Sequence, residues 1–332
     1  MDLFPSPEQE LLADTASDFV ARSVDAQVVR SLEAGEPGYD PAHWATMATL
    51  GWAELELLEL ALVADRLGRG PLPSPLVVTG ALRNALPRLA AEVEPEAVLT
   101  LAVLTPGAPH ERVAPTITGG DTLSGTFLLV PYAAGADVIV AVTTSGLVAI
   151  DAAAGGAVLT RHDAIGGDPV YRLDCDAVPA RDVDGSVAAV LDHLAVTALA
   201  YTVGVAEVAL SLAVRHAKDR HQFGRPIGAF QAIAHRCADM RAEIDACRVL
   251  AYRAAWALSR DPDHELALAS ALAYANDALR RVALHAHQVH GAIGFSTEHD
   301  LHLYTRRIKA YELTYGGTVL HQERLAAAIG LA

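Results

Sequence analysis

The sequence is poor in cysteine and in basic residues, and both shortages narrow the classes of protein that it can encode. Three cysteines, Cys175, Cys237 and Cys247, occur among 332 residues, and no two have C-x-x-C spacing. This number excludes a disulfide framework and is typical of a reducing compartment. Lys and Arg number 25 against 40 Asp and Glu, so the net charge is −15. That charge argues against nucleic acid or an anionic membrane as the main partner.

Segments that direct a protein into a membrane are also lacking. The first residues, M-D-L-F-P-S-P-E-Q-E, are acidic and polar, which is not the pattern of a signal peptide. No apolar run reaches the ~20 residues that a transmembrane helix needs. We therefore expect a cytoplasmic protein without a membrane span. A hydrophobic content of 52% with 20% charged residues excludes a disordered chain, and the length suffices for two or three folded units.

Three regions differ in hydrophobic period and together predict an α+β protein. Residues 1–96 are predicted to form an N-terminal helical domain, which begins with Ser6 as helix cap, Pro7 at the first helical position and Gln9 three residues after the cap. Residues 97–185 are predicted to form a central antiparallel β barrel or sandwich. Residues 186–332 are predicted to form a four-helix bundle. The expected strands lie near residues 98–104, 116–118, 123–130, 138–142 and 147–150.

The helices of the C-terminal region are predicted from alanine- and leucine-rich segments and from the breakers between them. A long helix over residues 187–214 is expected to end in basic residues near Arg220. The string Phe223-Gly224-Arg225-Pro226-Ile227-Gly228 then interrupts the helical pattern with two glycines and a proline. A second helix is expected to begin near Ala229. Further helices are predicted over residues 242–259, 265–287, 300–313 and 319–329.

The basic end of the first long helix has two interpretations. Cations in a last helical turn complement the negative end of the helix macrodipole, and beside a turn with open backbone N–H groups they also suit a phosphate. An ordinary pair of antiparallel helices with a solvated basic end explains the same residues equally well. The spacing by itself does not separate the two.

Two longer strings in this region carry more specific information. The first is Arg220-x-x-Phe223-Gly224-Arg225-Pro226-Ile227-x-x-Phe230-Gln231, followed by Ala238-Asp239-Met240, and the second is Gln288-x-x-Gly291-x-x-Gly294-Phe295. Both strings and their separation resemble the acyl-CoA dehydrogenase superfamily. The resemblance extends over most of residues 186–332 and is weak before residue 185. It implies the three-domain fold of that family, with FAD bound where two subunits meet.

The resemblance also implies which residues contact FAD. In the family, one subunit holds the flavin ring and the acyl-CoA, while its neighbour holds the adenine and pyrophosphate of the same FAD. The second role needs a cation, amide groups and close backbone approach to a dianion. Residues at matching positions are Arg220, Phe223, Gln231, Gln288, Gly291, Ala292 in place of a usual second glycine, and Thr318. Solvated or purely packing roles for Phe223 and Gln231 are the alternative.

The residues with which a family member holds the flavin ring and the acyl-CoA are not matched in this sequence. The family's Gly-Ser-Asp turn and Trp-x-Thr strand are missing, although Tyr132 could contact a flavin if it is not buried in the β domain. The family also needs a carboxylate to remove the proton from Cα while a hydride leaves Cβ. Its Tyr-Glu-Gly-Thr motif is here Tyr315-Gly316-Gly317-Thr318, and the alternative position falls at Leu194. Asp192 and Glu312 are nearby carboxylates, and a solvated helix face explains Glu312 better than a relocated base.

These gaps predict a non-catalytic subunit that pairs with a catalytic acyl-CoA dehydrogenase paralogue, as in the α2β2 enzymes of the family that act on CoA thioesters of bulky acids, including steroid side chains. The alternatives are a homomeric dehydrogenase with Glu312 or Asp192 as base, a flavin-dependent monooxygenase on the same fold, and a scaffold protein without flavin.

The sequence is also rich in histidine near residue 290, with His285, His287 and His290 followed by His299 and His302. His285 and His287 do not share a helix face. His287 and His290 could share one, but no carboxylate or cysteine completes a recognisable ligand spacing, so no metal site is predicted.

Overall fold

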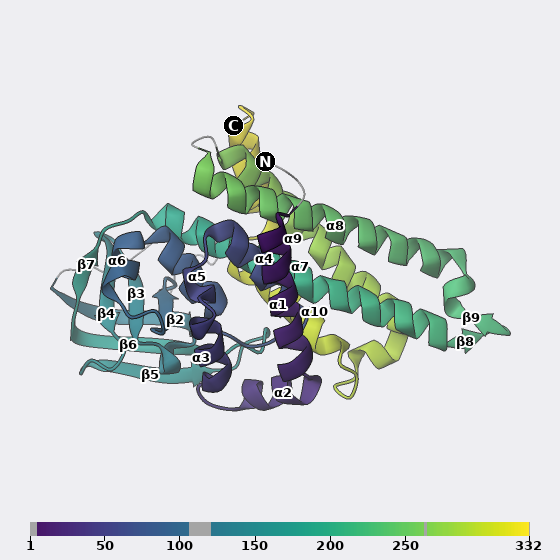
Figure 1. Ribbon diagram of the computed structural model, residues 1–332, viewed down its shortest axis with the longest axis horizontal. Helices are drawn as coiled ribbons and strands as arrows, with labels where there is room; N and C mark the ends of the chain where they lie inside the picture. The colour runs from purple at the N-terminus through teal and green to yellow at the C-terminus, as the bar shows by residue number, and fades with distance from the viewer. Residues whose placement is uncertain (1–4, 106–120, 262–263, 332) are drawn as a thin grey trace. The chain divides into compact units, whose positions relative to one another are not determined.

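The computed structural model describes residues 5–105, 121–261 and 264–331, and the sequence of elements is drawn in Figure 1. The predicted α+β class, with helices on either side of a central β region, is confirmed. In chain order, the elements are α1 (Pro7–Ser23), α2 (Ala26–Ala34), α3 (Pro41–Thr49), α4 (Leu57–Gly68), α5 (Leu76–Ala85), α6 (Pro87–Glu92), β1 (Leu99–Ala102), β2 (Thr122–Pro131), β3 (Val138–Thr143), β4 (Gly146–Asp151), β5 (Ala157–His162), β6 (Val170–Pro179), β7 (Arg181–Val183), α7 (Val187–Asp219), β8 (His221–Gln222), β9 (Arg225–Pro226), α8 (Gln231–Arg260), α9 (Glu265–His290), α10 (Leu301–Thr314) and α11 (Thr318–Ala328).

The chain forms two compact units. Unit 1 consists of Met1–Ala26, Ala61–Leu72 and Ala198–Ala332, and unit 2 consists of Gln27–Leu60 and Pro73–Thr197. Helices α4 and α7 each contribute residues to both units. The sequence predicted three domains, with boundaries at residues 96 and 185. These boundaries are not the boundaries of the two units, and the three domains stay a prediction.

Unit 2 contains the β domain, which consists of two sheets. One sheet has the strand order β1-β3-β4-β7 and the other has the order β2-β6-β5. Among the described residues of the domain, β1 and β3 pair in parallel and the other strand pairs are antiparallel, so the expectation of a wholly antiparallel domain is wrong at β1 and β3. The core is made by buried side chains of these strands, among them Leu123, Phe127, Val130, Ile139, Val148, Ile150, Tyr171 and Leu173.

The strand predictions were correct for β2, β3 and β4 and incomplete elsewhere. Strand β1 covers only part of the predicted run over residues 98–104, and Leu104 makes an isolated bridge to Leu128 in the other sheet. Strands β5, β6 and β7 were not predicted. The strand expected over residues 116–118 lies outside the described residues.

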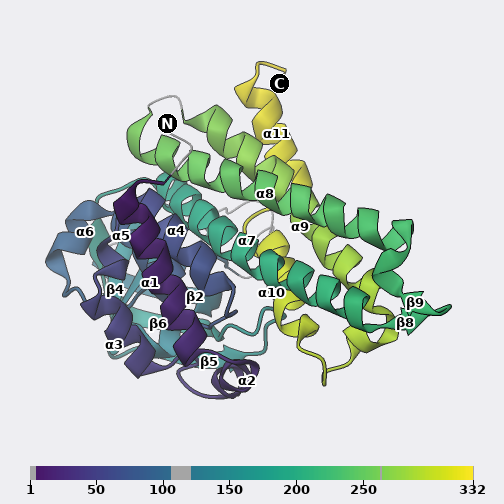
Figure 2. The ribbon, with the colours of Figure 1, turned by 45° about the vertical axis from the view of Figure 1, so that its right-hand side comes forward.

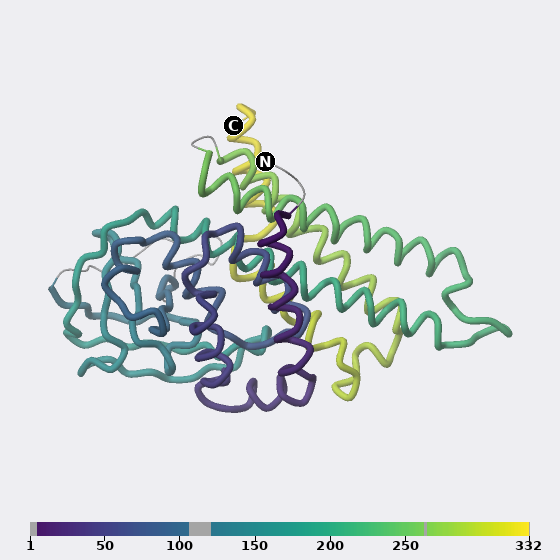
Figure 3. Tube along the Cα trace, viewed as in Figure 1, coloured from purple at the N-terminus to yellow at the C-terminus, as the bar shows by residue number. Residues whose placement is uncertain are grey.

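Unit 1 contains the long helices. Helix α1 begins as predicted: the Ser6 hydroxyl accepts a hydrogen bond from the Gln9 backbone N–H at 3.2 Å, and the Ser6 backbone N–H donates to the Gln9 side chain at 3.0 Å. The C-terminal half of α7 lies beside α8 and α9, and the β8–β9 hairpin extends from the ends of α7 and α8 (Figures 1 and 2). Helix α8 is continuous over 30 residues, where the sequence predicted a separate helix over 242–259. Figure 3 shows the uninterrupted path of this helix.

A buried ion network fixes α4 against α7 and α8 within unit 1. The carboxylate of Asp65 is fully buried and accepts hydrogen bonds from Arg248 Nε at 3.0 Å and the Tyr252 hydroxyl at 2.6 Å. Arg248 also donates to Glu207 at 3.0 Å. Burial opposes ionisation of Glu207, but hydrogen bonds from Arg241 and Arg248 outweigh it and lower the pKa of Glu207 to about 2. Each buried charge in the network therefore has a partner of opposite sign.

Helix α7 corrects the expectation that no segment could cross a membrane. It is long and apolar enough by composition, with a mean hydropathy of 1.7 over an 18-residue window. However, 78% of that window is buried inside the protein, as in the core helix of a globular fold. One such helix is weak evidence for a membrane span.

Candidate functional site

Six of the seven residues predicted to contact a cofactor gather at one end of unit 1. Arg220 comes directly before the β8–β9 hairpin, and Phe223 lies in the turn of this hairpin. Gln231 is the first residue of α8. Gln288 is in the last turn of α9, and Gly291 and Ala292 follow that helix. Rings at the ends of α7 and α9 join the two groups, since the imidazoles of His216 and His290 stack with centroids 4.8 Å apart. We call this set of six residues the hairpin end.

The β8–β9 hairpin presents Phe223 to solvent. Strand residues His221 and Gln222 pair with Pro226 and Arg225, which leaves Phe223 and Gly224 as a two-residue turn. Both turn residues have positive φ, +53° and +80°, as in the type I′ turns that match the twist of a hairpin. A positive φ is uncommon for a bulky residue such as Phe223, whose side chain is 92% exposed. The sequence predicted only a connector here and missed the hairpin.

Cations and amides at this end are accessible. Arg220, Gln231 and Gln288 are all exposed. Arg220 makes no side-chain hydrogen bond or ion pair with any described residue. Arg225 differs, because its guanidinium lies 4.1 Å from the centre of the Phe230 ring. The hairpin end therefore offers a cation and polar amides that the fold itself does not use.

The backbone after α9 is open. Gly291 has φ +64°, and a Cβ added to it would meet no atom within 4 Å. Ala292 beside it is exposed. A ligand could thus approach this backbone without meeting a side chain, which is the property that the sequence predicted for Gly291.

The seventh predicted residue, Thr318, lies elsewhere in unit 1. It opens α11 directly after Gly316 and Gly317, and the Gly316 carbonyl accepts a hydrogen bond from Asn276 in the middle of α9. Twelve residues of helix separate Asn276 from Gln288, which corresponds to about 18 Å. The structure therefore places Thr318 apart from the hairpin end.

The carboxylates considered as bases are engaged or buried. Glu312 lies 2.9 Å from Lys309 in an ion pair on α10, with its side chain 18% exposed. Asp192 belongs to α7 and is 9% exposed. Leu194, at the alternative base position, is a buried leucine. Glu312 belongs to unit 1, whereas Asp192 and Leu194 belong to unit 2.

Tyr132 is a core residue of unit 2. It is 6% exposed, and its hydroxyl donates to Asp168 at 2.8 Å while accepting from the Ser74 backbone N–H at 2.9 Å. Burial in the β domain, the alternative weighed for this tyrosine, is the arrangement found.

The histidines of α9 pack against rings. His290 is 5% exposed and lies between His216 and His299, whose ring centroids are each 4.8 Å from its own. Its Nδ1–H donates to the Ala286 carbonyl at 2.8 Å. His287 stacks on Phe295. Among residues 5–105, 121–261 and 264–331, no group of three or more His, Cys, Asp or Glu could hold a metal ion.

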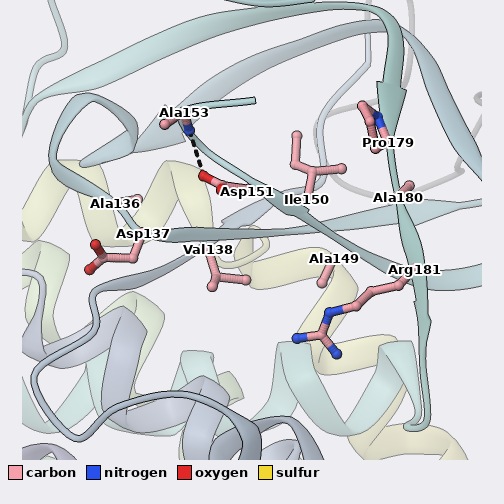
Figure 4. A pocket seen from close by; sticks show the side chains of 10 residues that line it. All are labelled: Ala136, Asp137, Val138, Ala149, Ile150, Asp151, Ala153, Pro179, Ala180 and Arg181. Carbon is pink, nitrogen blue, oxygen red and sulfur yellow. Dashed lines mark hydrogen bonds between the residues drawn. The ribbon is translucent and has the colours of Figure 1, made fainter. Parts of the chain in front are cut away.

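The cavity in the β domain does not qualify as a ligand site. It has a volume of about 550 Å³ and is drawn in Figure 4. Its charged side chains already have partners: Asp137 accepts from the Val98 backbone at 2.7 Å, and Asp151 accepts from Ala153 at 2.8 Å. Arg181 pairs with Glu92 at 2.5 Å. Alanines dominate the rest of the lining.

Comparison with known proteins decides the family. Acyl-CoA dehydrogenase IpdE2 of Mycobacterium tuberculosis is 31% identical over 323 residues, which cover 91% of this chain and 91% of IpdE2. The chain belongs to the acyl-CoA dehydrogenase family. The family model described as the acyl-CoA dehydrogenase C-terminal domain matches residues 185–330.

Solved structures agree with this assignment. A variant of the Tcur3481-Tcur3483 steroid ACAD has a TM-score of 0.86 at 28% identity, and the match covers 97% of this chain and 98% of that one. The ChsE4-ChsE5 complex from Mycobacterium tuberculosis has a TM-score of 0.85 at 25% identity with full coverage of both chains. PigA, solved with FAD and proline, shares the fold with a TM-score of 0.85 at 21% identity over the whole of both chains.

FAD is the cofactor of the acyl-CoA dehydrogenase family, and the hairpin end fits part of it. A dinucleotide needs a cation for its phosphates, a close backbone approach and polar groups for its edges. Arg220, Gly291 and the amides of Gln231 and Gln288 meet these needs, and all are accessible. This fit concerns the nucleotide end of FAD and not the reacting end. At position 316, where the family commonly has the glutamate that acts as base, this chain has glycine.

Proposed function

We propose that this chain is the partner subunit of a heteromeric acyl-CoA dehydrogenase. In this role it completes the FAD site of a catalytic paralogue, which oxidises the Cα–Cβ bond of a CoA thioester to the enoyl-CoA. FAD supplies the hydride acceptor when bound, and a carboxylate must take the Cα proton. The proposal assigns that carboxylate to the paralogue.

The observation that carries the proposal is the packing at Gly316. Gly316 has φ +95°, a left-handed conformation that disfavours any side chain. A Cβ at this position would lie 2.9 Å from Leu320 Cδ2 and 3.0 Å from His321 Nε2. The space of a base is therefore filled by other side chains, and the change from the family motif is more than the loss of one carboxylate.

The hairpin end supports the second half of the proposal. Its residues are exposed in the single chain, which is the arrangement expected of groups that act on a neighbour. In the proposal Arg220 holds a phosphate, Phe223 packs against the nucleotide, and Gln231 and Gln288 hydrogen-bond it. Gly291 and Ala292 allow the backbone to come close. Thr318 opens α11 away from the hairpin end, so it has no part in this half of the proposal.

Assembly and substrate follow from the comparisons as parts of the same proposal. The Tcur3481-Tcur3483 and ChsE4-ChsE5 structures each combine two named proteins, and we propose a similar pairing here, as an α2β2 assembly. A homo-oligomer is the alternative state.

The substrate class is also part of the proposal. The Tcur3481-Tcur3483 pair is named as a steroid enzyme, and we propose that this protein likewise acts on CoA thioesters of bulky acids. A cytoplasmic location belongs to the proposal too.

Co-expression tests the proposal. Three samples are purified: this chain alone, the candidate paralogue alone, and the two proteins expressed together. The absorbance spectrum of each sample gives its flavin content, and reduction of the flavin by an acyl-CoA gives its activity. We expect full flavin content and activity only in the joint sample. Flavin and activity in this chain alone would overturn the proposal and favour a homomeric dehydrogenase. Oxygen consumption by the reduced flavin would indicate a monooxygenase, and absence of flavin in every sample would indicate a scaffold.

A further inference from the structure

Two adjoining cavities form a groove between α7 and α8, next to the β8–β9 hairpin. One has a volume of about 490 Å³ and the other a volume of about 390 Å³. Both are lined by Val214, Lys218 and Cys237, so they are parts of one groove. The lining residues lie within 210–218, 226–229 and 233–241, all in unit 1. We call this feature the α7–α8 groove.

The root of the hairpin closes one end of the groove and fixes its shape. The Ile227 backbone N–H donates to the Arg220 carbonyl at 2.8 Å, which ties the end of the hairpin to the end of α7. Gly228 lies so close to α7 that an added Cβ would be 3.1 Å from the Ala217 carbonyl oxygen. The groove is therefore formed in the single chain, before any partner binds, which lowers the cost of binding.

The groove combines an apolar floor with two accessible cations. Val214, Ile233 and Ala234 are among the apolar side chains that line the cavity nearer the hairpin. Arg215 and Lys218, one helical turn apart on α7, line the other cavity and are exposed. Neither makes a side-chain hydrogen bond or an ion pair with any described residue.

The third basic residue of the groove is already neutralised. Arg241 donates to Glu207 at 2.8 Å and to Asp245 at 3.1 Å. The charges open to a ligand are therefore those of Arg215 and Lys218. The chain as a whole has a net charge of −15, so this local positive potential favours an acidic partner.

The length of the groove fits a polypeptide segment. Its wall on α7 runs from Leu210 to Lys218, which corresponds to about 12 Å of helix. About two turns of a helix, or four residues of a strand, have this length. A small inorganic anion would contact the cations and leave the apolar floor in water. A segment with apolar and acidic side chains would cover both, and covering the floor adds favourable burial.

We propose that the α7–α8 groove docks a segment of the catalytic paralogue, with apolar side chains on the floor and Asp or Glu side chains at Arg215 and Lys218. The inference rests on the proposed function, in which the neighbouring hairpin end reaches the paralogue. Pro226 and Gly228 belong both to the hairpin root and to the groove lining, so the two surfaces are continuous. The groove contacts protein, so it anchors the paralogue independently of the cofactor.

Cys237 reports directly on this contact. It is partly exposed in the groove wall, whereas Cys175 and Cys247 are buried. The chain alone and the co-purified complex are treated with N-ethylmaleimide, and mass spectrometry follows the peptide that contains Cys237. We expect labelling of Cys237 in the chain alone and loss of this labelling in the complex.

Two substitutions test the charge and the floor separately, with the dissociation constant of the complex measured by mass photometry. Lys218→Glu exchanges an attractive ion pair for a repulsive one, so it should weaken assembly roughly 2- to 30-fold at low salt. This loss should shrink at about 1 M salt, where charges are screened. Ala234→Glu places a longer side chain on the floor, so its loss should persist in salt. Arg253→Glu and Ala242→Glu, at exposed positions of α8 outside the groove, are the matched controls.

The outcomes separate the docking groove from the proposed function, because the flavin content of the complex reports the partner role. Equal labelling of Cys237 in the chain alone and in an intact, flavin-containing complex would refute the docking groove while the partner role stands. Unchanged assembly of both Lys218→Glu and Ala234→Glu would refute it as well. Protection of Cys237 that rises with the concentration of this chain alone would assign the groove to a second copy and overturn the proposal. If the parent forms no complex, both proposals fail together.

Discussion

The imidazole of His321 occupies the space beside the Cα of Gly316. Its Nε2 lies 3.0 Å from where a Cβ would be, and the same nitrogen donates to the Tyr315 carbonyl at 2.9 Å. The ring is therefore held in place by a hydrogen bond within the motif that commonly carries the base in the family. A restored side chain would have to displace it.

The two adjacent glycines of this motif should differ sharply in tolerance. Gly316→Ala is expected to reduce the free energy of unfolding by about 2–4 kcal/mol, from the left-handed backbone and from overpacking. Gly317 has φ −74°, and a Cβ there would meet nothing within 4 Å. Gly317→Ala should therefore change stability by no more than about 0.5 kcal/mol. Urea unfolding of both variants measures the difference, and equal losses would contradict the packing argument.

Glu312 and Asp192 are expected to be dispensable for the reaction. Glu312 is paired with Lys309, and neither carboxylate lies at a position where the family places its base. Glu312→Gln and Asp192→Asn in the assembled complex should leave kcat/KM within about twofold of the parent, since an essential base contributes far more. Steady-state kinetics with an acyl-CoA provides the measurement. A loss of a hundredfold or more in either variant would point to a relocated base in this chain.

Arg220 is expected to determine how tightly FAD is retained. Removing a charge-assisted hydrogen bond to a phosphate costs about 1.5–3 kcal/mol, so Arg220→Gln should weaken FAD binding by roughly 10- to 150-fold. Gel filtration followed by absorbance gives the flavin content. Arg253→Gln changes an exposed arginine near the C-terminal end of α8, so it is the control and should retain FAD. Similar flavin loss in both variants would show a general charge effect instead.

The ring cluster at the hairpin end should make stability fall in mild acid. Burial lowers the pKa of His216, and the neighbouring His299 and Arg220 lower it further. The carboxylate of Asp219 acts in the opposite direction and raises this pKa. Burial likewise lowers the pKa of His290, with further lowering by His216, His299 and His287, opposed by the Ala286 carbonyl. The unfolded chain then binds more protons below about pH 6.5, so stability is complete above that pH and is lost as pH falls through the lower folded values.

A single substitution tests this pH dependence. His216→Phe keeps a ring on His290 but removes one titrating group, so it should reduce the loss of thermal stability between pH 7.5 and pH 5. Glu207 of the buried network does not contribute in this range, because its pKa is about 2. Thermal unfolding at several pH values provides the data. An unchanged pH profile in the variant would assign the acid sensitivity to other groups.

Arg248 should be the most sensitive residue of the buried network. Its removal takes one arginine partner from the fully buried Asp65 and another from Glu207, so Arg248→Met is expected to cost about 3–5 kcal/mol. Arg253→Met on the exposed side of the same helix is the matched control and should cost little. Denaturant unfolding distinguishes them. A small effect of Arg248→Met would mean that Tyr252 and Arg66 suffice to neutralise Asp65.

The sequence by itself determined the features that depend on nearby residues. The capping box of Ser6 and Gln9 is complete within four residues, and the interruption at Phe223–Gly228 follows from two glycines and a proline. The absence of a carboxylate at Gly316 is likewise legible in the motif. These signals are local, because caps and turns are decided by backbone groups a few positions away. The class of fold was predicted from the change in hydrophobic period along the chain, and the family from the resemblance of the two longer strings at residues 220–240 and 288–295.

Tertiary structure alone decided the features that join distant residues. The parallel pairing of β1 with β3, the stack of His287 on Phe295 and the ring of His321 beside Gly316 each depend on how helices and strands pack. Strands β5 to β7 belong with them, because their half-exposed residues form strands only once a neighbour supplies hydrogen bonds. Packing selects among many locally acceptable arrangements, and no short-range pattern records that choice.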